Sequence, residues 1–230
     1  MRDEEYQVRL KPCIVASLGE KAVKDALQAT QADMIEVRLD LVDGDPLQAI
    51  RSIRASTCLP IIATNRWKAE GGRFNGSEEE RIELLCNASE QADLVDIELE
   101  SKLRDELIRQ IDRPAIVSYH DLSGMPDQEE LRSILQEISR TGASIAKIAV
   151  TPARQKDNLM LLELLLEANM PLCVIAMGEI GRHLRAVASI YGSALTYGYV
   201  SEATAPGQMS VTDLRQALNI LSADQKSYIR

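Results

Sequence analysis

Short apolar runs alternate with helical patterns along the whole of this 230-residue sequence. The runs number eight, and their starts lie 21 to 34 residues apart, which leaves room in each interval for one helix and two short loops. They cover residues 13–18, 34–39, 60–66, 94–99, 115–120, 145–150, 171–177 and 194–200. Repeated strand-then-helix units without a break in composition predict a parallel sheet flanked by helices, an α/β fold.

The number of strand-then-helix units distinguishes between the possible parallel folds. An open doubly wound sheet has fewer strands and usually a glycine-rich first turn, whereas Leu18-Gly19-Glu20 follows the first run here. Eight units fit a closed (β/α)8 barrel. We therefore predict one TIM barrel as a single domain over residues 1–230, with residues 1–10 covering its bottom.

Several helix ends carry recognisable signals. Asp45 stands before a proline at the first helical position, and Ser77 and Glu80 have the spacing of a capping box. Gly142 suits the left-handed conformation that ends many helices. These signals agree with the intervals that the apolar runs leave for helices.

Composition narrows the functional classes. The formal net charge is −9 and aromatic residues make up only 3%, which argues against binding to nucleic acid or to an anionic membrane. The first residues lack the apolar segment of a signal peptide, and Glu163, Glu167 and Asn169 interrupt the most apolar stretch. The four cysteines are too far apart for a zinc motif. We expect a soluble cytoplasmic protein without a bound metal.

Charged and polar side chains lie inside several of the predicted strands. Residues two apart in a strand point to the same face, and such pairs are Glu36 with Arg38, Thr64 with Arg66, Asp96 with Glu98, and Ser118 with His120. Burying such groups is costly unless they are paired. Most of them lie near the carboxyl ends of their strands, where barrel enzymes have their active sites. An internal ion-pair network would explain one such residue. Several charged residues on separate strands instead favour an active site at the open end of the barrel.

Lys147 lies in the middle of the apolar segment Ile145-Ala146-Lys147-Ile148-Ala149-Val150. Burial and nearby arginines would favour the neutral form of its amine, which can attack a carbonyl group and form a Schiff base. A lysine that extends out of the strand end is the alternative. The other charges nearby favour the nucleophile.

One of the two histidines, His120, ends a predicted strand and can move a proton in either direction near neutral pH. The other, His183, stands between Arg182 and Arg185 in a predicted helix and is interpreted as a solvated residue. Gly178 and Gly181 follow the seventh run, where many barrels bind phosphate, although glycines are common at such turns. Residues 201–208 form a small loop at the barrel mouth and are a candidate lid.

Taken together, these motifs resemble those of the type I 3-dehydroquinate dehydratases, the Schiff-base enzymes of the shikimate pathway of aromatic amino acid biosynthesis. The similarity extends from the first strand to the last helix. It rests on residues 36–40 (EVRLD), 64–66 (TNR) with 70–72 (EGG), 118–121 (SYHD), 146–149 (AKIA), Met177-Gly178 with Arg185, and 205–208 (APGQ). The resemblance implies a (β/α)8 barrel, a homodimer and a lyase that needs no metal or organic cofactor.

The resemblance also implies catalytic roles. Lys147 would form an imine with the C3 ketone of 3-dehydroquinate. His120 would remove the adjacent C2 proton and then protonate the departing C1 hydroxyl, a net syn loss of water that gives 3-dehydroshikimate. Glu70 would orient the histidine ring and balance its charge.

Substrate-binding residues follow from the same resemblance. Arg185 would bind the substrate carboxylate, because a planar guanidinium suits a two-point contact. The other residues implied are Ser17, Glu36, Arg38, Arg66, Thr204 and Gln208, the last two belonging to the lid. Threonine stands at 204 where the family usually has serine, and it keeps the hydroxyl. The choice of Arg185 over Arg182 rests on the family spacing from Met177.

Two other functions fit part of the sequence. A class I aldolase would also use a buried strand lysine, but it usually needs a phosphate-binding loop after the last strands. A barrel that only binds a small acid would leave Lys147 and His120 without a role. Activity on 3-dehydroquinate distinguishes the three.

Overall fold

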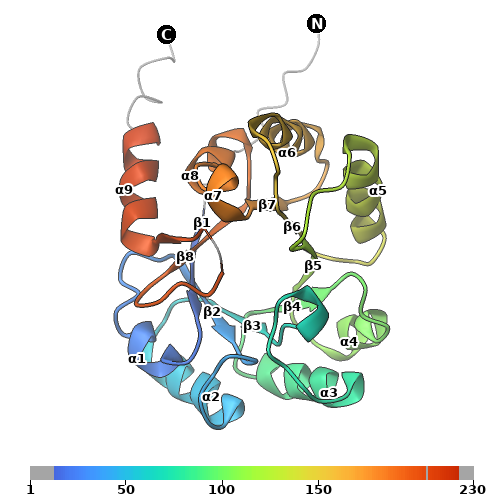
Figure 1. The fold of residues 1–230 in the computed structure, drawn as a ribbon. Coiled ribbons are helices and arrows are strands. Elements are labelled where there is room, and N and C mark those ends of the chain that lie inside the picture. Colours follow the sequence, from blue (N-terminus) through green and yellow to red (C-terminus); the bar gives the residue numbers. More distant parts are fainter. Residues whose placement is uncertain (1–12, 206, 223–230) are drawn as a thin grey trace, which may run out of the picture.

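The computed structural model describes residues 13–205 and 207–222. Nine strands of this part of the chain form one sheet, and eight of them match the predicted strands (Figure 1). They are β1 Cys13–Leu18, β2 Met34–Arg38, β3 Ile61–Thr64, β4 Leu94–Glu98, β5 Ala115–Asp121, β6 Ile145–Val150, β7 Leu172–Ala176 and β8 Leu195–Tyr199. The short β9, Met209–Ser210, was not predicted. The predicted role of residues 1–10 lies outside the described residues.

Helices occupy every interval between the eight main strands, and a further helix follows the last strand (Figure 1). They are α1 Ala22–Ala26, α2 Pro46–Ser56, α3 Glu78–Ser89, α4 Arg104–Gln110, α5 Gln128–Ser139, α6 Gln155–Glu167, α7 Gly178–Gly181, α8 Leu184–Val187 and α9 Val211–Ser222, with the 3-10 turns η1 Lys68–Glu70 and η2 Ala188–Tyr191. The Asp45 cap and the Ser77–Glu80 capping box are confirmed. The expectation of one helix in each interval is wrong between β7 and β8, where α7, α8 and η2 are separate short turns. Gly178 and Gly181 lower the helix propensity there.

The sheet closes into a barrel. The strands follow the order β7-β6-β5-β4-β3-β2-β1-β8-β9, and all of their pairings are parallel. Between β7 and β8 the contact is shorter: the Ala194 amide donates to the Leu172 carbonyl at 2.8 Å, and the Val174 amide donates to Ser193 Oγ at 3.2 Å. The predicted (β/α)8 fold is confirmed, with the helices outside the ring of strands (Figure 1).

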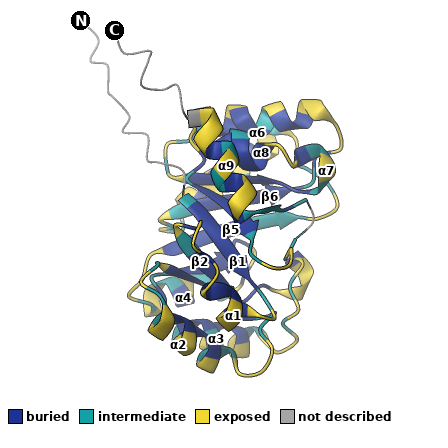
Figure 2. Cartoon of the chain, turned by 90° about the vertical axis from the view of Figure 1, so that its left-hand side faces the viewer, coloured by how far each residue is buried: buried dark blue, intermediate teal, exposed yellow. Residues whose placement is uncertain are grey.

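Two apolar clusters hold the barrel together. The larger one fills the space between strands and helices, and its members include Val37, Leu85 and Leu131. The smaller one fills the barrel interior, with Ile62 and Ile116 among its members. Figure 2 shows the buried strands enclosed by helices whose outer faces are exposed. The interior is thus a packed core rather than a pore.

The interior changes character toward the carboxyl ends of the strands. On β3 the apolar Ile62 is followed two residues later by Thr64, and on β5 Ile116 is followed by Ser118; all four are completely buried. Because residues two apart point to the same face, each strand presents an apolar side chain below and a polar one above. A polar layer therefore lies on top of the apolar core, where the barrel opens.

Candidate active site

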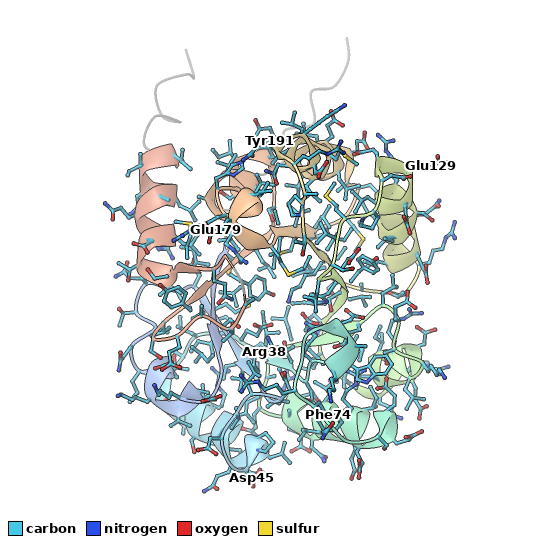
Figure 3. The ribbon with its side chains drawn as sticks, in the orientation of Figure 1. Arg38, Asp45, Phe74, Glu129, Glu179 and Tyr191 are labelled. Atoms are coloured by element: carbon cyan, nitrogen blue, oxygen red, sulfur yellow. The ribbon has the colours of Figure 1, made fainter. Side chains whose placement is uncertain are left out.

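One cavity at the carboxyl ends of the strands is lined by every residue predicted to act in catalysis or substrate binding. These are Ser17, Glu36, Arg38, Arg66, Glu70, His120, Lys147, Arg185, Thr204 and Gln208. Seen along the barrel axis, Arg38 lies near the middle of the ring, whereas Asp45, Glu129 and Tyr191 lie at its periphery (Figure 3). The cavity also contacts Ala205 of the predicted lid, and six residues to which the sequence gave no individual role: Gly71, Leu122, Ala149, Ile175, Met177 and Tyr197.

Lys147 reaches the floor of this cavity from the middle of β6, and only 4% of its surface is exposed. Its Nζ lies 2.9 Å from Asp96 Oδ2 and 3.6 Å from Glu36 Oε1. The expected nearby arginine is present, because Arg66 binds the other oxygen of Asp96, but the groups in direct contact with the Lys147 nitrogen are carboxylates, which were not predicted. Strand register brings these groups together: Asp96 and Glu36 point into the same layer of the barrel interior as Lys147.

Asp96 links the lysine to a buried arginine network. Its Oδ1 accepts hydrogen bonds from Arg66 Nη2 at 2.7 Å and from Ser118 Oγ at 2.7 Å. Burial alone would raise the pKa of Asp96, but the charges of Arg66 and Lys147 hold it well below its usual range. The carboxyl group is therefore ionised throughout the neutral range. The sequence identified Asp96 as a buried charge but gave it no role.

Arg66 is fixed by several partners at once. Besides Asp96, its guanidinium donates to Glu98 Oε1 at 3.0 Å and to Ser118 Oγ at 2.8 Å. Glu98 in turn accepts from the completely buried Arg81 at 2.5 Å. Burial would lower the pKa of Arg66, yet the neighbouring carboxylates raise it above its usual value. These contacts give Arg66 a supporting position behind Lys147.

His120 and Glu70 form a hydrogen-bonded pair, with His120 Nδ1 2.7 Å from Glu70 Oε2. Burial lowers the pKa of His120 well below 6.5, and the charges of Arg66 and Lys147 lower it further. Burial raises the pKa of Glu70 to about 8 against the opposing charge of Arg66. The imidazole is thus neutral at neutral pH, and Nε2 is the ring nitrogen left for a ligand.

The turn that carries Glu70 depends on close backbone packing. Glu70 ends the short η1 turn, and Gly71 after it has a φ of +83°, a conformation that favours glycine. A Cβ atom on the next residue, Gly72, would lie 1.8 Å from the carbonyl oxygen of Arg66. The Glu70-Gly71-Gly72 sequence therefore lets the chain fold back against β3 and bring the carboxyl group to His120.

Glu36 and Arg38 occupy the β2 side of the cavity. Glu36 accepts hydrogen bonds from Ser17 Oγ at 2.5 Å and from Thr64 Oγ1 at 3.0 Å, which orient its carboxylate toward Lys147. Arg38 makes a two-point contact with Asp40 at 2.8 and 2.7 Å. Both side chains are therefore held in place before any ligand arrives.

The loop from Ser201 to Gln208 covers one side of the cavity; Pro206 within it lies outside the described residues. Gln208 Oε1 accepts from the Thr204 amide at 2.7 Å, and Thr204 Oγ1 donates to Ser17 Oγ at 2.9 Å. The Gly207 carbonyl accepts from Arg185 Nε at 2.9 Å. The described residues of the loop thus join β1 to the helix that carries the arginine.

Arg185 and Arg182 differ sharply in position. Arg185 is 4% exposed and lines the cavity, whereas the side chain of Arg182 is 51% exposed. Burial lowers the pKa of Arg185 to about 10, and the charge of Arg182 contributes to the decrease. This placement favours Arg185 as the group that meets an anionic ligand. His183 is exposed, as expected.

Tyr197 is a cavity residue for which the sequence gave no signal. It lies in an apolar strand, 3% exposed, and would be assigned to the core. Its ring centroid is nevertheless 4.3 Å from Lys147 Nζ. An aromatic residue in a buried strand carries no signal that separates a core position from a cavity wall.

Two kinds of feature are absent from the described part of the chain. Between residues 13 and 222, with Pro206 left aside, no three metal-ligating side chains (histidine, cysteine, aspartate or glutamate) are grouped in a way that could hold a metal ion. No helix within the described ranges is both long enough and apolar enough to cross a membrane.

Known proteins resemble the chain over nearly its whole length. A family model described as type I 3-dehydroquinase matches residues 13–225. The 3-dehydroquinate dehydratase of Methanothrix thermoacetophila is 54% identical over 219 residues, which cover 94% of this chain and 95% of that protein. That of Methanocella arvoryzae is 45% identical over 213 residues, covering 91% and 97%.

Solved structures of 3-dehydroquinate dehydratases are similar to this chain in fold. The 3-dehydroquinate dehydratase of Geobacillus kaustophilus superimposes with a TM-score of 0.85 at 30% identity, covering 95% of this chain and 93% of that one. The type I 3-dehydroquinate dehydratase of Clostridium difficile, solved with covalently modified comenic acid, gives a TM-score of 0.84 at 30% identity, with 93% of each chain covered.

Proposed function

The chain belongs to the type I 3-dehydroquinase family, and on that premise we propose that it dehydrates 3-dehydroquinate to 3-dehydroshikimate through an imine on Lys147. The reaction would serve the shikimate pathway of aromatic amino acid biosynthesis. The observation that carries the proposal is the cavity itself, because it combines a buried amine, a neutral histidine and a buried arginine. Each of these groups fits one requirement of the reaction.

The first step is covalent. The Lys147 nitrogen gives one proton to water and attacks the C3 carbonyl carbon. The carbonyl oxygen then takes that proton and a second one from the nitrogen, and it leaves as water. The product is a protonated imine, whose positive charge draws electrons from the neighbouring C2–H bond. Asp96 and Glu36 support this state, because their oxygens, 2.9 and 3.6 Å from the nitrogen, balance its charge.

The second step is the loss of water. His120 Nε2 accepts the C2 proton, and the electron pair of the C–H bond moves to the imine, which becomes a neutral enamine. The electrons then return to expel the C1 hydroxyl, and His120 gives that group the proton it took. Glu70 supports this exchange through its 2.7 Å contact with Nδ1, because a carboxylate there stabilises the imidazolium form. Attack of water on the imine carbon releases 3-dehydroshikimate and restores Lys147.

Binding of the substrate precedes both steps. We assign its carboxylate to Arg185, since a guanidinium offers two parallel donors to a carboxylate. Its hydroxyls would meet the polar rim of Glu36, Arg38 and Ser17, and Thr204 and Gln208 would close over it. The loop supports this assignment, because Gly207 and Tyr197 accept hydrogen bonds from Arg185 through their carbonyls.

Borohydride trapping tests the function directly. Borohydride delivers a hydride to an imine carbon and leaves a stable secondary amine. Treatment in the presence of 3-dehydroquinate should add one ligand-sized mass per chain, and peptide mapping should place it on Lys147. Lys147→Met should lose both adduct and turnover, whereas the control Lys102→Met, at an exposed lysine outside the cavity, should keep both.

Three outcomes would contradict the assignment. An adduct on another lysine, or an active Lys147→Met protein, would remove the Schiff-base mechanism. An adduct that forms with a phosphorylated aldol substrate and not with 3-dehydroquinate would make the protein an aldolase.

We further propose a cytoplasmic homodimer. The resemblance in sequence implies the dimer, and the exposed leucines Leu159 and Leu166 on α6 offer apolar surface that a second copy could cover. The cysteines at 13, 58, 86 and 173 are all unpaired, which suits a reducing compartment. Light scattering after gel filtration should give twice the chain mass, and a monomer at micromolar concentration would contradict the dimer.

A further inference from the structure

Tyr197 lines the cavity, yet the proposed reaction gives it no task. Lys147 Nζ lies over the face of its ring, 4.3 Å from the centroid. A cation within about 6 Å of an aromatic centroid is attracted by the negative charge above the ring face. The ring therefore acts on the same nitrogen that Asp96 and Glu36 approach.

The surroundings strengthen this contact and fix it in place. Tyr197 is 3% exposed and packs in the inner apolar cluster with Ala149 and Cys173, so water does not weaken the attraction. Its backbone is held from both sides, since β8 pairs with β1 at Val15 and the Tyr197 carbonyl accepts from Arg185 at 3.3 Å. The ring cannot turn away without disturbing the barrel wall.

The ring face, rather than the hydroxyl, is the part that meets the nitrogen. The hydroxyl is buried and has no hydrogen-bond partner among the described residues. Burial raises the pKa of Tyr197 well above 10, and the charge of Glu36 raises it further, so the side chain stays neutral. A phenylalanine at this position would keep the ring face and lose only the hydroxyl.

We propose that the ring face of Tyr197 stabilises the positive charge on the Lys147 nitrogen after that nitrogen has joined the substrate, and thereby keeps the imine protonated. The inference rests on the proposed imine reaction. Only the protonated imine draws electrons efficiently from the C2–H bond. Loss of the proton from the imine nitrogen would therefore stop the elimination. Tyr197 adds to the two carboxylates without adding a further negative charge that would compete for the proton.

Fluorination of the ring separates charge from shape. Phenylalanine, 4-fluorophenylalanine and 3,4,5-trifluorophenylalanine are placed at position 197; they have nearly the same size, but each added fluorine weakens the negative ring face. Each protein is mixed with 3-dehydroshikimate and borohydride over a range of pH, and mass spectrometry gives the fraction of Lys147 that carries an adduct. The control is the same series at Phe74, a ring outside the cavity.

The pH midpoint, at which trapping falls to half, should decrease with each added fluorine. The decrease should be roughly 0.3 to 1.5 pH units over the whole series. This is a change of about 2- to 30-fold in the ratio of protonated to neutral imine at a given pH. Tyr197→Phe should resemble the wild type, and the Phe74 series should show no trend. A purely packing role for Tyr197 would leave the midpoint unchanged across these rings, and that result would overturn the proposal.

The failure of the underlying function gives a different result. If the wild type forms no adduct on Lys147 at any pH, the imine reaction is wrong and this inference is wrong with it. If the adduct forms in every variant with the same pH midpoint, the imine reaction stands and only the role of Tyr197 is removed.

Discussion

Replacing Glu70 with glutamine should stabilise the folded protein at alkaline pH while it impairs catalysis. Burial raises the pKa of Glu70 from 4.5 to about 8, although Arg66 opposes the change. The folded protein therefore resists ionisation of this carboxyl group, and the unfolded chain does not. A glutamine of the same shape cannot ionise, and its oxygen can still accept a hydrogen bond from His120 Nδ1.

The sign and size follow from the two pKa values. Because the folded-state value lies above the unfolded one, the stability associated with Glu70 is fully present below pH 4.5 and is lost as the pH rises through about 8. The complete loss amounts to about 5 kcal/mol at most. Glu70→Gln should thus match the wild type at pH 5 within about 1 kcal/mol, and exceed it at pH 9 by about 3 to 5 kcal/mol.

Urea denaturation of both proteins at pH 5, 7 and 9 measures this difference as the free energy of unfolding. The matched control is Glu79→Gln on α3, which replaces an exposed carboxylate outside the cavity. A difference between Glu70→Gln and the wild type that stays constant from pH 5 to 9 would refute the reasoning. It would mean that Glu70 ionises as easily in the folded state as in the unfolded chain.

Catalysis by His120 and Glu70 should also depend on the proton of the Glu70 carboxyl group. While Glu70 is protonated, Nδ1 of His120 cannot donate to a carboxylate, and Nε2 is not free to accept a proton. The wild-type kcat/KM should therefore rise with pH toward a midpoint near 8 that belongs to the pair as a whole. Glu70→Gln should lose this step and should turn over more slowly than the wild type at pH 9, because the imidazolium formed during proton removal lacks its counter-charge.

Three further outcomes are expected. His120→Ala should reduce turnover by about 10²–10⁴-fold and still form the borohydride adduct on Lys147, because proton transfer and carbonyl attack belong to different side chains; activity within a few-fold of the wild type would exclude His120 as the base. Arg185→Lys should raise KM, since an ammonium group cannot make the two-point carboxylate contact, while Arg182→Lys should change little; the reverse result in steady-state kinetics would exchange the two assignments. Exhaustive treatment with EDTA should leave activity unchanged, and activity that is lost and then restored by a divalent metal would contradict the mechanism.

The strands could be predicted closely because their signal is local. A strand that is buried on both faces reads as an apolar run, and the run at 145–150 coincides with β6. The run at 60–66 extends beyond β3 at both ends, because Pro60 and the residues after Thr64 are outside the ladder. The charges at alternate positions also predicted which end of the barrel carries the polar cavity, since burial of such groups needs partners.

The partners themselves could not be predicted, because they depend on strand register. Alternation places Lys147 and Asp96 on inward faces, but only the pairings of Glu98 with Ser118 and of Ser118 with Lys147 set their relative heights. A change of register by two residues would preserve every inward face and separate the amine from the carboxylate. The irregular segment between β7 and β8 was missed for a similar reason, since its short turns are held by tertiary contacts rather than by a helical pattern.

The charges behind the reactive nitrogen form a balanced buried set. The cations of Lys147, Arg66 and Arg81 face the carboxylates of Asp96, Glu98 and Glu36 through contacts of 2.5 to 3.6 Å. In the proposed reaction the protonated imine places its positive charge on this same nitrogen, facing the same carboxylates. The balance is disturbed only when the imine becomes a neutral enamine, at the moment when His120 takes up the proton and its charge. The positive charge therefore passes from one side of the cavity to the other, and Glu70 lies where it arrives.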